Sequence, residues 1–185
     1  LKLGSPAAVE VEELSGGGRE YYPGSTRIRW DFPAREGMEP VKLYWYDGLA
    51  KGQTYGRQTI GTIDCVLRAA QNRPPLLVEL EKKYGRDFGD NGSILVGDKG
   101  IMAMGPFGDG CRMVPEEAHR AFPKPAATLP RIKGTHQSDF FRACRGGAPA
   151  CANFDYSEPL AEIVLLGDIA MRAGVGRRVE WDGPA

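Results

Sequence analysis

Histidine is the side chain best suited to acid–base or ligand-binding chemistry near neutral pH, and this chain of 185 residues has two. His136 follows Arg131 and Lys133, at a point where a helix is predicted to begin. The first turn of a helix offers free N–H donors, so a hydroxylated or anionic ligand can bind there. A surface histidine without a ligand fits the same pattern, and both interpretations stay open. His119 lies in a short charged segment, where a surface position is the simpler expectation.

Aromatic side chains form the second candidate. Tyr44, Trp45 and Tyr46 are consecutive, and aromatic rings of this kind stack on sugars. Strand alternation instead places Trp45 on one face and its neighbours on the other, which is typical of a strand buried on both faces. The sequence alone therefore favours packing over ligand binding for these three residues.

Established catalytic and cofactor motifs are missing. GGG at 16–18 lies between two predicted strands, and GPFGDG at 105–110 has neither the spacing nor the following helix of a dinucleotide site. The chain has no phosphate-binding loop, nucleophile elbow or His-Glu-x-x-His helix. We therefore expect no catalytic, cofactor-binding or metal-ligating residue in this chain.

The cysteines do not suggest a zinc site, because they are too widely spaced for a Cys-x-x-Cys pair. They are Cys65, Cys111, Cys144 and Cys151. Free thiols are the favoured prediction, and a disulfide between Cys144 and Cys151 is the alternative.

Charge and hydropathy exclude two classes of partner. The 24 basic and 24 acidic residues cancel, which argues against nucleic acid as a partner. No apolar run is long enough to span a bilayer, so no membrane partner is expected. A chain of 185 residues is long enough to bury a core of its own, and we expect one domain over residues 1–185.

Strands are predicted in the first third of the chain by alternating hydrophobicity. They are residues 7–14, 25–32 and 41–47, with Val9, Val11, Ile28, Trp30 and Phe32 on the apolar face and Ala7 as a further candidate. Their short, turn-rich connections favour an antiparallel meander. A hairpin is predicted at 92–105, around the turn Gly97–Gly100.

Helices are predicted in the rest of the chain. They are two turns within 62–72, two turns within 74–85 with Pro74 and Pro75 at its start, 115–122, 136–145 capped by Thr135, and a long helix from Asp155 or Ser157 to Gly174. The long helix is expected to bury Leu160, Ile163, Val164, Gly167, Ala170 and Met171, with Gly167 at a close backbone crossing. A short strand is predicted at 177–181. Strands followed by helices indicate an α+β fold, an open and mainly antiparallel sheet with helices packed on one face.

Three stretches together resemble the C-terminal domain of Gfo/Idh/MocA-type oxidoreductases, the family of glucose-fructose oxidoreductase and inositol dehydrogenase. They are VKLYWYDG at 41–48, DNGSILVGDKGIMAMG at 90–105, and the stretch from GTHQ to MRAG at 134–174. The last is the most specific, and with gaps the resemblance extends over nearly the whole chain. It is closest to a bacterial branch of unassigned dehydrogenases.

The resemblance implies a dihydrodipicolinate-reductase-like C-terminal domain without its N-terminal Rossmann domain. In the family, the helix that carries a catalytic Asp and His ends in a phrase similar to LKLGSP, which here stands at residues 1–6. The family's cofactor-binding and catalytic residues then have no counterpart in this chain. NAD or NADP would be the cofactor of the parent protein, with none bound by this fragment, which alone is predicted to be inactive.

Four residues are implied as contributors to a substrate site: His136 first, then Arg131, with Trp45 and Tyr46 behind them. The resemblance implies a sugar, cyclitol or related polyol as substrate, and a homo-oligomer through the sheet face. We expect a substrate-binding and oligomerisation domain. The alternative is a free-standing carbohydrate-binding or dimerisation module without catalysis. The stretch 48–91 matches no pattern of the family.

Overall fold

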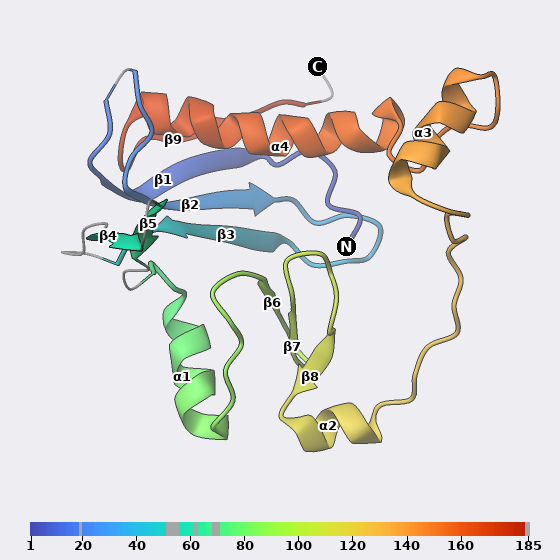
Figure 1. Cartoon of the computed structure of the whole chain (residues 1–185), viewed down its shortest axis with the longest axis horizontal. Helices are drawn as coiled ribbons and strands as arrows, with labels where there is room; N and C mark the ends of the chain where they lie inside the picture. Colours follow the sequence, from blue (N-terminus) through green and yellow to red (C-terminus); the bar gives the residue numbers. More distant parts are fainter. Residues whose placement is uncertain (19, 51–55, 61–62, 68–70, 184–185) are drawn as a thin grey trace. The chain divides into compact units, whose positions relative to one another are not determined.

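The computed structural model describes residues 1–18, 20–50, 56–60, 63–67 and 71–183 (Figure 1). It combines helices with antiparallel sheets, so the predicted α+β class is confirmed. The chain divides into two compact units, Leu1–Tyr46 with Thr128–Ala185 and Asp47–Ala127.

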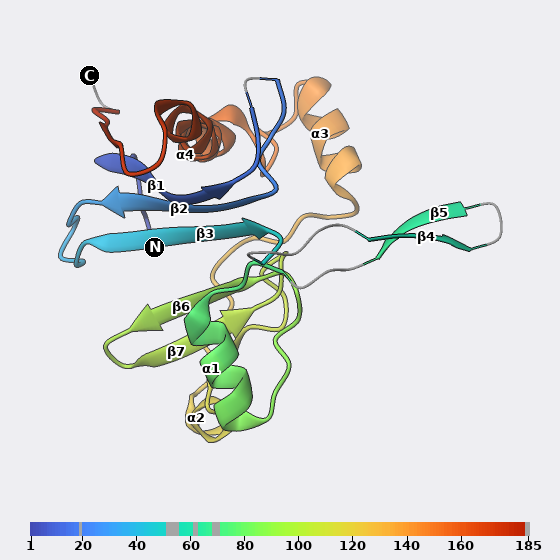
Figure 2. The ribbon, with the colours of Figure 1, turned by 90° about the vertical axis from the view of Figure 1, so that its left-hand side faces the viewer.

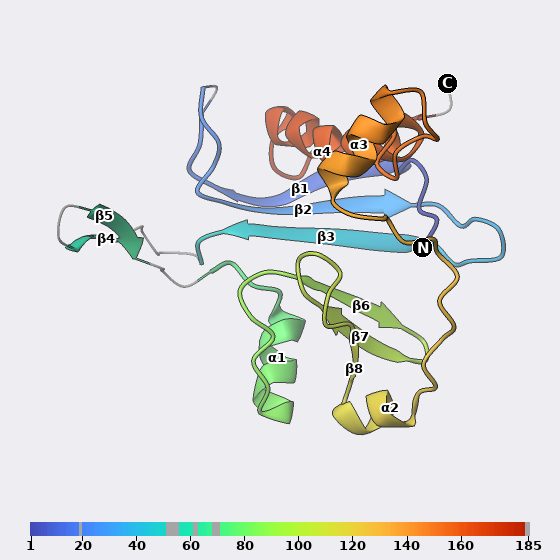
Figure 3. The same ribbon diagram turned by 45° about the vertical axis from the view of Figure 1, so that its right-hand side comes forward.

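The first unit contains a four-stranded sheet and two helices, both of which lie in the C-terminal part of the chain. Its elements are β1 (Ala8–Ser15), β2 (Ser25–Phe32), β3 (Val41–Gly48, which runs to the boundary of the unit), α3 (His136–Cys144), α4 (Phe154–Ala173) and β9 (Arg178–Glu180). The sheet order is β3-β2-β1-β9, and β1 pairs antiparallel with both β2 and β9. The arrows of β2 and β3 point in opposite directions in Figures 1 and 3. The predicted meander and the predicted last strand are therefore confirmed.

The core of this unit lies between the sheet and α4, which covers one face of the sheet (Figures 1 and 2). Alternate residues of β1 and β2 point toward α4, because successive side chains of a strand face opposite sides. The buried cluster consists of Val9, Val11, Ile28, Trp30, Phe32, Leu166 and Ala170. The predicted apolar face of the first two strands is thus correct, except that Ala7 is exposed and Ala8 is buried instead.

Trp30 and Gly167 fix the height of α4 above the sheet. The indole N–H of Trp30 donates a hydrogen bond of 2.9 Å to the carbonyl of Ile163. A Cβ atom on Gly167 would lie 2.9 Å from Cζ2 of Trp30. The close approach predicted at Gly167 is therefore made to an indole ring, and the prediction of a backbone crossing was wrong.

Two expectations about α4 need correction. The N-cap of α4 is Asn153, two residues before Asp155 and four before Ser157, the two predicted caps, and the hydroxyl of Ser157 donates to the Asn153 carbonyl. Leu160 and Val164 are exposed, because the stripe that meets the sheet is centred on Leu166, Gly167 and Ala170.

A further correction concerns strand β3, which the sequence predicted to be buried on both faces. Trp45 is 52% exposed and Tyr44 is exposed as well. The reason is topological. β3 is the edge strand of the sheet, whereas α4 packs against β1 and β9 at the other side.

The second unit is organised around a small sheet of its own. Its elements are β4 (Gly56–Ile60), β5 (Ile63–Leu67), α1 (Pro75–Tyr84), β6 (Ser93–Gly97), β7 (Gly100–Met104), β8 (Arg112–Val114) and α2 (Glu116–Ala121). The order β6-β7-β8 confirms the predicted hairpin and adds one strand. Leu80 of α1 packs with Ala103 and Val114 in its core. The predictions of α1 and α2 are confirmed.

The helix predicted within 62–72 is wrong, because residues 63–67 form β5, which pairs antiparallel with β4. The segment contains Ile63 and Val66, whose branched side chains favour strands over helices. Residues 68–70 lie outside the described part of the chain.

Candidate functional site

The start of α3 carries His136, the first candidate. Thr135 caps the helix as predicted. Its hydroxyl accepts a hydrogen bond of 3.1 Å from the Ser138 N–H, while the Ser138 hydroxyl accepts one of 2.9 Å from the Thr135 N–H. This capping box satisfies two of the donors at the helix start. The N–H groups of His136 and Gln137 belong to the same first turn, where a helix provides no backbone acceptor.

His136 and Arg131 are both solvent-exposed on the segment that leads into α3. Gly134, between them, has a φ of +93° and turns the chain into the helix. The imidazole, the guanidinium and the free amides of the first turn are therefore presented from one short stretch. Such a set of donors suits the hydroxyl groups of a sugar or polyol.

The first turn of α3 also contains Asp139, the one residue of this helix that is buried. Its carboxylate accepts hydrogen bonds from Arg142 and from the backbone N–H of Cys151, and Arg142 also donates to the Ala148 carbonyl. The hydrogen bond from Arg142, followed by that from Cys151, lowers the pKa of Asp139. The loop after α3 is thus folded back onto the helix that carries His136.

Trp45 and Tyr46 face opposite sides of β3. Val41 and Leu43 lie on the same face of β3 as Trp45, and both pack against the core. Tyr46 lies on the other face, near Arg27 and Glu12. Burial raises the pKa of Tyr46, and the nearby Arg27 charge opposes that shift only in part. A single ligand cannot stack on both rings.

The four candidates do not form one cluster. α3 lies apart from the C-terminal end of β3, where Trp45 and Tyr46 are located, in both Figure 1 and Figure 3. His136 and Arg131 lie five residues apart on one short segment, whereas the two aromatic residues lie near the C-terminal end of β3. A substrate site centred on His136 therefore does not include Trp45 and Tyr46.

An ion-pair ladder on the sheet face opposite α4 was not foreseen from the sequence. We use this name for Glu10, Glu12, Arg27, Arg29, Asp31 and Arg178. Arg29 lies at its centre and contacts Glu12 at 2.5 Å, Glu10 at 2.9 Å and Asp31 at 3.2 Å. The side chains of Arg29 and these three carboxylates are 18% to 21% exposed. The signal was present in the strand alternation, since the charged residues of β1 and β2 face each other across the register Glu10↔Arg29.

The ladder shifts the ionisation of its members. Burial raises the pKa of Asp31, but the hydrogen bond from Arg178 and the charge of Arg29 outweigh it, so the pKa lies below its ordinary value. For Arg29, burial acts against the charged form, and the hydrogen bond to Glu12 with the three carboxylate charges overcomes it, so its pKa is raised. The ladder therefore favours the charged forms of both Asp31 and Arg29.

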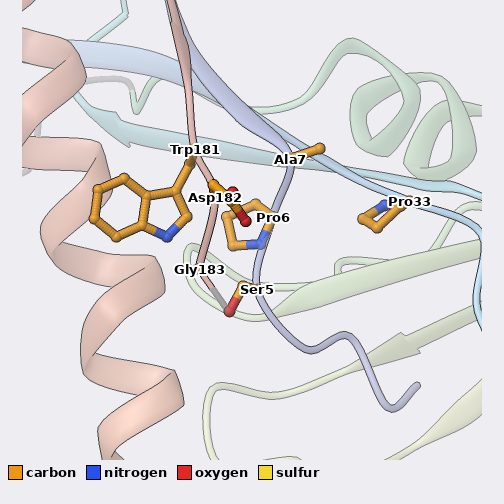
Figure 4. Close-up of a pocket in the computed structure, with 7 residues that line it drawn as sticks. All are labelled: Ser5, Pro6, Ala7, Pro33, Trp181, Asp182 and Gly183. Atoms are coloured by element: carbon orange, nitrogen blue, oxygen red, sulfur yellow. The ribbon is translucent and has the colours of Figure 1, made fainter. Parts of the chain in front are cut away.

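A pocket of about 250 Å³ lies where both ends of the described chain meet (Figure 4). It is lined by Ser5, Pro6, Ala7, Pro33, Trp181, Asp182 and Gly183. The Ser5 hydroxyl and the Trp181 indole N–H both donate to the Glu162 carboxylate of α4. The backbone N–H of Trp181 donates to the Ala7 carbonyl at 2.9 Å. These contacts tie the two chain ends to α4, and none of the predicted site residues lines the pocket.

Among the described residues, the cysteines and the potential metal-ligating side chains form no further candidate site. Cys111, Cys144 and Cys151 are free and exposed. Cys151 lies beside Asp139, whereas Cys144 is five residues further along α3 and so points to a different side of the helix. Within the described ranges, no three side chains of His, Cys, Asp or Glu gather closely enough to hold a metal ion.

Among the helices that the structure describes, none combines the length and hydropathy needed to cross a bilayer.

Comparison with known proteins gives no relative. No family model, no curated protein and no solved structure matches the chain.

Proposed function

We propose that the chain is the substrate-binding and oligomerisation domain of an NAD(P)-dependent oxidoreductase that acts on a sugar, cyclitol or related polyol. The observation that carries the proposal is the start of α3. There the exposed His136 and the first-turn amides of a capped helix lie within the stretch that resembles the Gfo/Idh/MocA family, and the exposed Arg131 lies three residues before that stretch. The other two resembling stretches fall on β3 and on the β6–β7 hairpin, so each coincides with a regular element.

In such an enzyme the nicotinamide exchanges a hydride with the substrate carbon that bears the hydroxyl group. This chain would contribute binding and orientation. His136 can donate to or accept from a substrate hydroxyl, and Arg131 can donate to a second one. Because Trp45 and Tyr46 lie elsewhere, we assign them a secondary role at the edge of the sheet.

The finer fold assignment, a dihydrodipicolinate-reductase-like domain, belongs to the same proposal. It is supported by an antiparallel sheet with one face covered by α4. The face opposite α4 carries the ion-pair ladder. Pairing of two copies through it, as the resemblance implies, would therefore be sensitive to salt.

The cofactor prediction is tested by calorimetric titration of the chain with NAD and with NADP. We expect no binding of either nucleotide. Micromolar binding would contradict the proposal that the cofactor belongs to another domain.

The substrate site is tested by titrating the same chain with a panel of monosaccharides, cyclitols and linear polyols. We expect weak binding of at least one compound, and a loss of roughly tenfold or more in affinity for His136→Ala and for Arg131→Ala. His119→Ala is the matched control, because it removes the other histidine of the chain and should leave affinity unchanged. Equal effects of all three substitutions, or no binding at all, would contradict the assignment.

The exposed Trp45 on an edge strand favours a second candidate, a free-standing carbohydrate-binding module. In that case Trp45→Ala, and not His136→Ala, would abolish binding of the sugar panel. A purely structural dimerisation domain would instead form dimers in sedimentation experiments and bind no sugar.

A further inference from the structure

The peptide bond between Asn91 and Gly92 lies directly before strand β6, which begins at Ser93. Asn91 is exposed, and its side-chain amide makes no hydrogen bond to any residue that the structure describes. A side chain without a partner changes freely between its rotamers. The Cγ atom of Asn91 can therefore approach the backbone nitrogen of Gly92.

Glycine is required at position 92 by the backbone of the second unit. The φ of Gly92 is +149°, which residues with a side chain rarely adopt. A Cβ atom at this position would also overlap the carbonyl oxygen of Met104 on β7. The packing that selects glycine thus leaves no side chain to shield the backbone nitrogen of Gly92 from the Asn91 amide.

These two residues can react with each other in water, because the reacting atoms belong to neighbouring residues. The Gly92 nitrogen gives up its proton to a base in the solvent and attacks Cγ of Asn91, so that a new C–N bond closes a cyclic imide. The bond from Cγ to the side-chain nitrogen breaks, and this nitrogen takes up a proton and leaves as ammonia. Water then opens the imide. Breaking the new C–N bond gives aspartate, whereas breaking the original peptide bond gives isoaspartate, whose main chain runs through Cβ and Cγ.

The other two asparagines of the chain lack this arrangement. Asn72 donates a hydrogen bond of 3.3 Å to the Asp47 carbonyl, and the next residue is Arg73. Asn153 is the N-cap of α4, so the nitrogen that would attack it belongs to Phe154, the first residue of the helix. The side chains of Arg73 and Phe154 hinder the approach of the two atoms, which must reach a near-attack geometry. Asn91 is therefore the asparagine best placed to react.

We propose that Asn91 is a site of spontaneous deamidation, at which the chain is converted to aspartate and isoaspartate. Water is the only co-reactant, and the inference does not depend on the proposed oxidoreductase function. Isoaspartate would lengthen the main chain by one carbon directly before Gly92, which has no free space beside the Met104 carbonyl. The pair Ser93↔Met104, at the end of the β6–β7 ladder, should therefore open in the isoaspartate form.

The test is incubation of the full chain of 185 residues in water enriched in heavy oxygen, followed by peptide mapping in a mass spectrometer. We expect the Asn91 peptide to replace its amide nitrogen with one heavy oxygen atom at least about tenfold faster than the Asn72 and Asn153 peptides, a ratio equivalent to about 1.4 kcal/mol in activation free energy. The rate should rise with pH, because the Gly92 nitrogen must lose its proton. Equal rates at the three asparagines, including no reaction at any of them, or a rate independent of pH would overturn the proposal.

Asn91→Gln is the matched control, because it keeps an exposed amide but its extra methylene moves the carbonyl carbon away from the position for ring closure. It should take up no heavy oxygen at position 91. Methyl transfer from labelled S-adenosylmethionine by a protein isoaspartate methyltransferase measures the isoaspartate form. Hydrogen exchange tests the effect on the sheet, since the aged native chain should lose protection in β6 while the equally aged Asn91→Gln chain keeps it. The same protection in both chains would contradict the proposed effect on β6.

Discussion

The two faces of the β3-β2-β1-β9 sheet are held by opposite kinds of interaction, although they are built from alternate residues of the same strands. One face buries Val9, Trp30 and their neighbours under α4. The other carries the ion-pair ladder, in which Arg29 contacts three carboxylates. The same backbone register therefore supports an apolar contact on one side and a charged one on the other.

This difference indicates how stability is divided between the faces. Burial of apolar side chains stabilises a fold in proportion to the area removed from water, and the cluster under α4 is almost fully buried. Ion pairs that remain about one-fifth exposed contribute much less, because water and salt screen them. We expect the apolar face to dominate the free energy of unfolding and the charged face to determine how stability responds to salt and pH.

The sharpest test of this division compares two tryptophans. Trp30→Ala should lower the free energy of unfolding by about 4 kcal/mol, because it opens a cavity under α4 and removes the hydrogen bond to the Ile163 carbonyl. Trp45→Ala, at the exposed edge strand, should lower it by no more than about 1 kcal/mol. Urea unfolding followed by circular dichroism measures both. Similar losses at the two positions would show that α4 does not seal the core.

Arg29 provides the corresponding test on the charged face. Arg29→Met keeps much of the side-chain volume but leaves Glu10, Glu12 and Asp31 without their shared cation, so we expect a loss of about 2 kcal/mol. Lys2→Met removes an ion pair with Glu36 in which both side chains are mostly exposed, and it should change stability by less than about 0.5 kcal/mol. An Arg29 variant as stable as the Lys2 variant would mean that the ladder contributes nothing to folding.

Gly167 tests how closely α4 approaches the apolar face. Alanine is the better helix former by about 1 kcal/mol, yet its Cβ would stand 2.9 Å from the Trp30 ring. Because overpacking costs about 1–3 kcal/mol, Gly167→Ala should lower the free energy of unfolding by about 1 kcal/mol. Combined with Trp30→Phe, which removes the Cζ2 atom, the same substitution should become neutral or stabilising. A thermal-unfolding double-mutant cycle measures this coupling, and strictly additive effects would contradict the proposed contact.

How much the sequence could predict depended on whether its patterns were local. The alternation of β1 and β2, the cap at Thr135 and the Gly97–Gly100 turn are set by neighbouring residues, and all three were predicted correctly. The position of β3 at the sheet edge depends on strand order, which no local pattern encodes, so Trp45 was wrongly expected to be buried.

The candidate site shows the same limit. The exposure of His136 and the cap in front of it follow from local sequence, and the structure agrees with both. The separation of Trp45 and Tyr46 from α3 depends on tertiary arrangement. The ladder was visible in the alternating charges of β1 and β2, but the assignment of partners required the register Glu10↔Arg29.

The smallest expected effect, the pH response of Asp31, distinguishes the two faces most directly. The hydrogen bond from Arg178 and the charges of Arg29 and Lys42 outweigh burial and hold the pKa of Asp31 below its ordinary value of about 3.9. A carboxyl whose pKa is depressed by folding stabilises the folded state above its unfolded pKa, and this contribution is lost as the pH falls through the folded pKa. Asp31→Asn cannot ionise, so it should be less stable than the native chain at pH 7, and the difference should shrink as the pH is lowered below about 4. Urea unfolding of both chains across this range measures the change. A difference independent of pH would mean that Asp31 acts through its shape and hydrogen bonds, and not through its charge.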